Sequence, residues 1–201
     1  MSDIVGHYFF AYNLNMSMNI ILASASPRRK AILQSAGYNL EIIPSEYDEK
    51  INGKLYSDIL VQNCAYCKAM EVKNRIKDSR LIVSADTVVV SDGIILGKPK
   101  DKTEAFLMLQ NLSNKTHFVA TSIAIVSDSL VLNATEKTYV TFRKLSDDDI
   151  SLYIENSKPF DKAGSYGIQD DGFDFVLDIK GELDNVIGFP LKLFKQTISN
   201  F

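Results

Sequence analysis

The chain has 201 residues, of which 46% are hydrophobic and 23% are charged, and its formal net charge is −3. This length suits one large domain or two lobes around one core, and the slight acidity argues against a nucleic-acid binder or a membrane-surface protein. No apolar run approaches the roughly 20 residues of a membrane helix, and two cysteines cannot form a disulfide framework, so we expect a cytoplasmic protein.

The N-terminal segment differs from the rest of the chain. Met1 to Ser17 contains no Lys or Arg, and its apolar middle is interrupted by His7. A signal peptide would need a basic start, an uninterrupted apolar stretch and a small-residue cleavage site. We therefore predict that residues 1–17 are a dispensable extension and that residues 18–201 form a single domain.

The first strong pattern is a buried strand followed by a basic helix start. Residues 19–23 are an apolar run, Ser26 suits a helix N-cap, and Pro27 suits the first helical position, with the helix ending near Gly37. Free N–H groups and the helix dipole favour an anion there. The guanidinium groups of Arg28 and Arg29 make that anion a phosphate, although an ordinary basic surface helix is the alternative.

The next elements are a short strand at 39–44, an acidic loop at 45–50 and a helix at about 57–76. The acidic loop is either a solvated turn or a holder of a divalent cation. In the helix, Leu60, Cys64 and Cys67 share one face. That spacing favours core packing over a redox motif or half of a zinc site.

A second buried strand, at 81–85, runs into Asp86 and Thr87, which are followed by three valines at 88–90. An unpaired carboxylate there would cost several kcal/mol, so Asp86 must be ion-paired, metal-bound or catalytic. A turn at 92–93 leads to a return strand at 94–96. Asp101 then caps a helix, with Glu104 completing a capping-box-like pair.

The rest of the chain alternates strands and helices. We predict strands at 116–126, 130–145 and 173–179, a helix capped by Ser146, a glycine-punctuated loop at 161–172 and a last helix from Pro190. His117 is interpreted as a half-buried polar residue rather than a ligand. Hairpins mixed with helical crossovers predict an α/β fold with a mixed sheet.

Chemically active side chains gather in four segments that we interpret as loops, at 24–29, at 48–49, at 86–87 together with 97–98, and at 161–169. They supply phosphate ligands, carboxylates and neutral groups able to read a base. Such a mixture suits metal-assisted hydrolysis of a phosphoanhydride, and the two histidines are too few and too badly placed for a Ser-His-Asp set. The candidates are Ser24, Arg28, Arg29, Lys68 and Lys98 for phosphate, Glu49 and Asp86 as carboxylates, and Thr87 and Gln169 for the base.

The segment LASASPRRKAIL resembles the signature of the Maf nucleotide pyrophosphatases, and SADTVV, GKP, VTFRKLSDDDI, DKAGSYGIQ and NVIGFPL follow in family order. The resemblance implies an ITPase-like fold, elongated and two-lobed with a central cleft, in a family whose members are often homodimers. It also implies a catalytic domain that hydrolyses nucleoside triphosphates between the α- and β-phosphates with Mg²⁺ or Mn²⁺. Asp86 is then the proton acceptor, or a metal ligand together with Glu49.

Substrate preference follows from the same resemblance. The dTTP/UTP pyrophosphatase branch has Arg, Thr and Gln at the places of Arg28, Thr87 and Gln169, whereas the 7-methyl-GTP branch has Trp, Gln and Glu. We expect dTTP, UTP and related modified pyrimidine nucleotides as substrates. The alternatives are a nucleotide-binding regulator of septum formation and cell division, and a 7-methyl-GTP pyrophosphatase. Leu183 and the acidic run at 170–171 depart from the family pattern.

Overall fold

A mixed seven-stranded sheet organises the computed structural model, which describes residues 19–199. The extension predicted for residues 1–17, and residues 18, 200 and 201, lie outside this range. The strand order is β2-β1-β3-β5-β6-β7, with β4 paired to β3; β1 runs parallel to β2 and β3, and the other pairs are antiparallel. The strands are β1 Asn19–Leu22, β2 Asn39–Ile42, β3 Leu81–Ser91, β4 Ile94–Leu96, β5 Thr116–Val126, β6 Val131–Phe142 and β7 Val176–Lys180.

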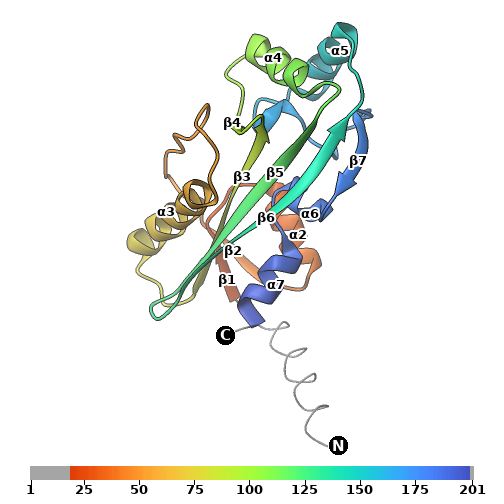
Figure 1. The fold of residues 1–201 in the computed structure, drawn as a ribbon. Coiled ribbons are helices and arrows are strands. Elements are labelled where there is room, and N and C mark those ends of the chain that lie inside the picture. The colour runs from red at the N-terminus through yellow and green to blue at the C-terminus, as the bar shows by residue number, and fades with distance from the viewer. Residues whose placement is uncertain (1–18, 200–201) are drawn as a thin grey trace, which may run out of the picture.

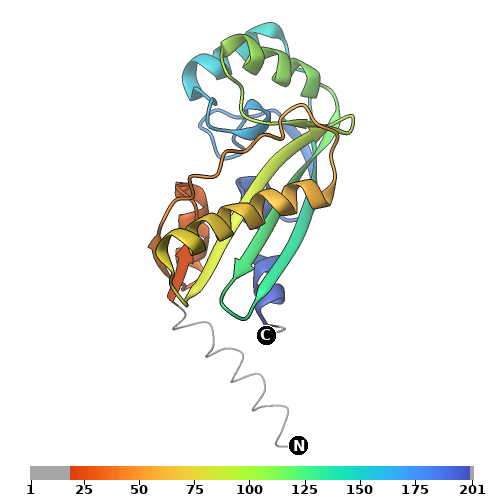
Figure 2. The same cartoon turned by 90° about the vertical axis from the view of Figure 1, so that its left-hand side faces the viewer.

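Helices cover both faces and one end of this sheet. Helix α3 lies along one face, α2, α6 and α7 lie on the other, and α4 and α5 cap the upper end (Figures 1 and 2). The molecule is elongated and two-lobed, as expected, and β3, β5 and β6 run through both lobes. The helices are α2 Pro27–Ser35, α3 Asp58–Ile76, α4 Lys102–Leu112, α5 Asp147–Ser157, the 3-10 turn η1 Ala163–Ser165, α6 Leu183–Ile187 and α7 Leu191–Ser199. Within the described part of the chain, no helix has both the length and the apolar character that a membrane crossing requires.

The helix starts follow the predicted capping residues. Ser26 accepts from the Arg29 N–H at 3.4 Å, and Ser146 forms a reciprocal capping box with Asp149. The Asp101 side chain accepts a hydrogen bond from the Glu104 N–H at 2.8 Å. The Glu104 side chain, however, accepts from the N–H of Lys100 rather than from that of Asp101. The predicted box at Asp101 is therefore only a cap.

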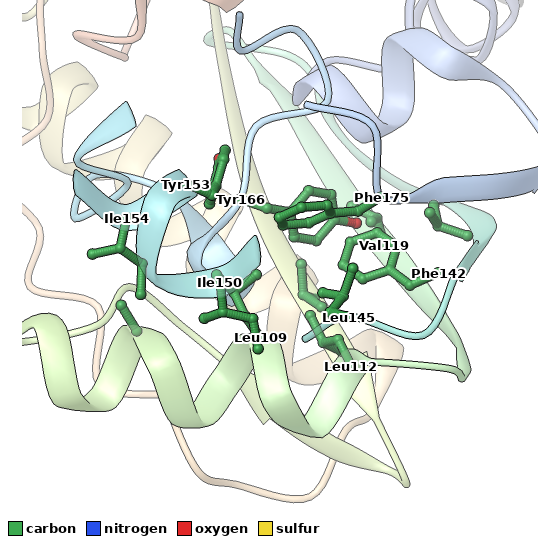
Figure 3. Close-up of a cluster of buried hydrophobic side chains, with 13 residues drawn as sticks. Leu109, Leu112, Val119, Phe142, Leu145, Ile150, Tyr153, Ile154, Tyr166 and Phe175 are labelled. Carbon is green, nitrogen blue, oxygen red and sulfur yellow. The ribbon is translucent and has the colours of Figure 1, made fainter. Parts of the chain in front are cut away.

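The core of the upper lobe fixes the segment that closes the cleft. Figure 3 shows Leu109 of α4 facing Ile150 of α5 and Leu112 of α4 beside Leu145, with the aromatic residues Tyr166 and Phe175 in the same cluster. Apolar burial of this extent is the main stabilising term of such a lobe. Because Tyr166 belongs to this core, the loop after α5 is anchored from within.

Three sequence-based predictions about structure were wrong. The strand expected at 173–179 begins only at Val176, because Phe173 and Phe175 turn into the upper core while Leu177 is 67% exposed. Asp86 and Thr87 are not in a loop but in the middle of β3. His117 is buried rather than half-buried, with its Nε2 2.8 Å from the Tyr166 hydroxyl.

The cysteine prediction is confirmed for Cys64, which is buried in an apolar cluster between α3 and the sheet, while Cys67 is half-buried. Both are free thiols. Burial, with help from the charge of Asp86, raises the pKa of Cys64 to about 11. This thiol is therefore protonated at neutral pH and is a poor nucleophile or metal ligand.

Candidate active site

The site begins at a gap in the pairing along β3. Strand β5 pairs with β3 from Ile82 to Val90. On the opposite edge β1 pairs with β3 only up to Val83, and β4 only from Val89 onward. Within residues 19–199, no strand pairs with the stretch between them on that edge. In sheets with parallel strands, ligands bind where such strands end and the chain turns away.

A cleft of about 550 Å³ opens at this gap. Its walls come from the start of α2, the loop after β2, the middle of β3, the segment after β4, the loop after α5 and the end of α6. Six of the predicted site residues line it, and they are Arg28, Arg29, Glu49, Thr87, Lys98 and Gln169. Ser24, Lys68 and Asp86 are buried behind this wall.

Asp86 and Thr87 face opposite sides of the sheet because successive residues of a strand alternate. Asp86 contacts Lys68 of α3, on one face. Thr87 contacts Arg29 of α2, on the other. The cleft therefore spans the edge of β3, with carboxylates on one side and a hydroxyl and a guanidinium on the other.

On the α3 side, one lysine joins two carboxylates. Lys68 Nζ lies 2.5 Å from Asp86 Oδ1 and 2.5 Å from Glu49 Oε1. The side chains of Lys68 and Asp86 are 8% and 2% exposed, and that of Glu49 is 35% exposed. Burial alone would raise the pKa of Glu49, but Lys68, Lys98 and Arg29 outweigh it and the pKa is lowered. Glu49 is thus a carboxylate at neutral pH.

Asp86 Oδ2 has no hydrogen-bond partner among the described residues, although it is buried. An unsatisfied buried oxygen of this kind is rare and points to a functional role. No three His, Cys, Asp or Glu side chains of residues 19–199 converge as a metal cluster. The two carboxylates nevertheless fit Mg²⁺ or Mn²⁺, because such ions commonly take one or two carboxylates and complete their shell with substrate phosphates and water.

On the α2 side, Arg29 ties three elements together. Its Nε donates to the Gly188 carbonyl at 2.9 Å, its Nη1 to Ser24 Oγ at 3.1 Å, and its Nη2 to Thr87 Oγ1 at 3.1 Å. Burial lowers the pKa of Arg29, while Asp86 and Glu49 act in the opposite direction. These contacts leave part of the guanidinium donor set for a ligand in the cleft.

The cleft mouth is bridged between the lobes. Arg28 Nη1 of α2 lies 3.3 Å from Asp161 Oδ2 of the loop after α5. Farther along that loop, Asp170 accepts from the Tyr153 hydroxyl at 2.5 Å and lies 3.2 Å from Lys162 Nζ. This network holds the segment that carries the exposed Gln169.

Sequence reasoning missed several of the residues that build the cleft. The pairing of Tyr153 with Asp170 appears only when α5 folds back over the loop. A set of apolar side chains also lines the cleft without any sequence signal of its own, comprising Val89, Val119, Tyr166, Val186 and Ile187. They offer the nonpolar surface on which a planar base can lie.

The fold and the cleft define a mixed α/β protein with a cationic, carboxylate-containing cleft between two lobes. Residues 19–201 match the family model described as Maf-like protein, and the chain belongs to this family. It is 43% identical over 181 residues to a dTTP/UTP pyrophosphatase of Clostridium botulinum (strain Eklund 17B / Type B), covering 89% of this chain and 96% of that protein. It is 45% identical over 174 residues to a dTTP/UTP pyrophosphatase of Thermosipho africanus, covering 87% and 88%.

A crystal structure of a nucleoside-triphosphatase / dITP/XTP pyrophosphatase from Mycobacterium abscessus is also similar, with a TM-score of 0.47 and 15% identity. That similarity covers 91% of this chain and 97% of the other.

Proposed function

We propose that this protein hydrolyses dTTP and UTP to the monophosphate and pyrophosphate. The observation that carries the proposal is the convergence of Arg28, Thr87 and Gln169 in one cleft with the cations Arg29 and Lys98. Relatives that align with almost the whole described chain bear the name dTTP/UTP pyrophosphatase, which supports the same substrate class.

In this proposal the triphosphate lies along the cationic wall of the cleft. Arg29 and Lys98 donate to phosphate oxygens, near the N-terminus of α2. Ser24 supports phosphate binding indirectly, because its Oγ accepts a hydrogen bond from Arg29 Nη1 and so helps to position the guanidinium. The side chain of Lys68 is only 8% exposed. Its proposed role is to hold the two carboxylates in place, and the main phosphate contacts come from Arg29 and Lys98.

Asp86 is proposed to orient the attacking water and accept its proton. The water oxygen forms a bond to the α-phosphorus, and the bridging bond to the β-phosphate breaks with its electron pair leaving on pyrophosphate. In the alternative role, Asp86 would join Glu49 in holding Mg²⁺ or Mn²⁺, which when bound would neutralise charge on the phosphate oxygens. Lys68 orients Asp86 through Oδ1 and leaves Oδ2 without a partner among the described residues.

The base is proposed to lie against the apolar side chains of the cleft, within reach of Thr87, Gln169 and Arg28. A uracil or thymine edge offers O4 and O2 as acceptors and N3–H as a donor, which an amide and a hydroxyl can match. The same three side chains argue against 7-methyl-GTP as the substrate, because the branch that acts on it has Trp, Gln and Glu at these positions. The unpartnered Asp86 Oδ2 favours catalysis over a purely regulatory nucleotide binder, because binding alone gains nothing from that group.

The test is pyrophosphate release from dTTP, UTP, CTP, GTP and 7-methyl-GTP with Mg²⁺ or Mn²⁺. We expect turnover of dTTP and UTP, and little with the purine nucleotides. Tight UTP binding without turnover would support the regulator instead, and turnover restricted to 7-methyl-GTP would reverse the substrate assignment. Light scattering of the same sample addresses the predicted homodimer.

A further inference from the structure

Behind the cleft, a chain of buried polar groups connects α6 to Thr87. It begins at Asn185, which is fully buried and whose amide donates to the Val119 carbonyl and to Thr138 Oγ1, each at 3.0 Å. Thr138 in turn donates to the Glu182 carbonyl at 2.9 Å. These bonds fix the short helix α6 against β5 and β6, so its carbonyl oxygens have defined positions.

Two hydroxyls continue the chain from α6 to the cleft. Thr121 Oγ1 donates to the Asn185 carbonyl at 3.0 Å, and Thr121 is fully buried. Thr87 Oγ1 lies 3.0 Å from Thr121 Oγ1 and 3.4 Å from the Gly188 carbonyl. The Nη2 of Arg29 donates to the same Thr87 oxygen at 3.1 Å.

The direction of these bonds follows from counting protons. A hydroxyl has a single proton, whereas a carbonyl oxygen only accepts and a guanidinium only donates. Since Thr121 gives its proton to Asn185, the shortest bond open to Thr87 as a donor is to Thr121. In the other arrangement the Thr87 proton goes to Gly188. The Gly188 contact is long for a hydroxyl donor, so Thr121 is the better acceptor of the Thr87 proton, and Thr87 then has none for a ligand.

We infer that Thr121 and the Asn185 carbonyl turn Thr87 into a hydrogen-bond acceptor that reads an N–H group of the base. This inference rests on the proposed function and assigns the N3–H of uracil or thymine as the partner of Thr87. Phosphate oxygens are acceptors and cannot pair with such a hydroxyl, so Thr87 belongs to base recognition and not to phosphate binding. Thr121 is a positioning residue that sets specificity without touching the substrate.

The glycine at 188 keeps the Thr87 oxygen accessible. A Cβ at this position would lie 3.5 Å from Thr87 Oγ1, and the φ of Gly188 is +122°, a conformation that other residues rarely adopt. The absence of a side chain therefore leaves room for a ligand beside the acceptor.

The test compares UTP with the triphosphate of the pyrimidin-2-one ribonucleoside, whose N3 is an acceptor and whose base edge has no N–H. Thr121→Val removes the hydroxyl at nearly constant volume, and Thr121→Ser is the matched control that keeps it. The measured quantity is the ratio of kcat/KM for the two nucleotides from pyrophosphate release. The pyrimidin-2-one analogue also lacks O4, but this loss affects every variant equally. The difference between the ratios of the Val and Ser variants therefore reports the effect of the Thr121 hydroxyl alone.

We expect the wild type and Thr121→Ser to prefer UTP, and Thr121→Val to lower that preference about tenfold, as expected for one misdirected buried hydrogen bond. Equal ratios in the Val and Ser variants would overturn this inference while leaving the proposed function intact. No pyrophosphate release from UTP by the wild type would overturn both. Thermal unfolding checks that each variant is folded, and Thr121→Ala removes the same hydroxyl if the Val variant is not.

Discussion

The paired carboxylates around Lys68 allow chemistry and stability to be separated by mutation. With both carboxylates ionised, Asp86, Glu49 and Lys68 carry one net negative charge. Asp86→Asn removes a charge but leaves Lys68 paired with Glu49. Lys68→Met instead leaves two carboxylates, one of them only 2% exposed, without their cation. The two variants should therefore differ in stability.

The magnitudes follow from the burial of these groups. Losing one partner of a buried ion pair costs about 3–5 kcal/mol when a charge is left uncompensated, which applies to Lys68→Met. Asp86→Asn keeps a hydrogen-bonding side chain and should cost only about 1 kcal/mol. For a chain of this size, each kcal/mol lowers Tm by about 2–4 °C. The expected losses are therefore roughly 2–4 °C for Asp86→Asn and roughly 6–20 °C for Lys68→Met.

Activity should follow a different order. Loss of a proton acceptor lowers kcat by about 10²–10⁴-fold, so Asp86→Asn should be nearly inactive although it is stable and still binds UTP. Pyrophosphate release, equilibrium binding of UTP and thermal unfolding measure the three quantities on one preparation. A folded Asp86→Asn protein with near-normal kcat would refute the role given to Asp86. Equal Tm losses in the two variants would refute the charge reasoning.

Three other predictions concern the base, the cleft mouth and the upper core. Gln169→Glu replaces a group that donates and accepts with one that only accepts, so UTP turnover should fall about tenfold; an unchanged preference among nucleotides would exclude Gln169 from base reading. Asp161→Asn removes a solvent-exposed partner of Arg28, so stability should change by less than about 1 kcal/mol. The KM for UTP should fall a few-fold at low salt, and a higher KM would mean that Asp161 helps to place Arg28. Burial lowers the pKa of His117 from 6.5 to about 4, so the unfolded chain takes up this proton first and stability is lost as pH falls from 6.5 to 4, by about 3 kcal/mol. Urea unfolding at several pH values should show a shallower pH dependence for His117→Gln, and identical slopes would contradict this.

Local sequence signals predicted the elements well where a helix or strand carries its own start and period. Ser26 with Pro27, and Ser146 with Asp149, mark helix starts because their side chains bond to nearby backbone groups. Helix α6 has only five residues, which is too short for a helical period to appear. Phe173 and Phe175 have the alternating spacing of a strand, but both rings pack into the upper core and the strand begins only after them.

The site was predictable in its residue types but not in its geometry. A lysine at position 68, four residues after Cys64 on a mostly apolar helix face, was a signal of a buried ion pair that the phosphate interpretation overlooked. The pairing of Thr121 with Thr87 depends on the register between β3 and β5, which sequence periodicity does not determine. The gap beside Asp86 likewise depends on where β1 and β4 stop.

The continuity of β3, β5 and β6 through both lobes has a mechanical consequence. A sheet bonded along such lengths resists bending, and no single connecting segment between the lobes can act as a hinge, because three hydrogen-bonded strands would have to deform together. Of the loops that line the cleft, the one after α5 is held by Tyr166 in the upper core and by the Asp170 network, whereas the loop after β2, which carries Glu49, lies outside the sheet and that core. The sheet thus acts as a rigid frame for the cleft, and any adjustment around a nucleotide would be confined to the loop after β2 and to side chains of the cleft wall.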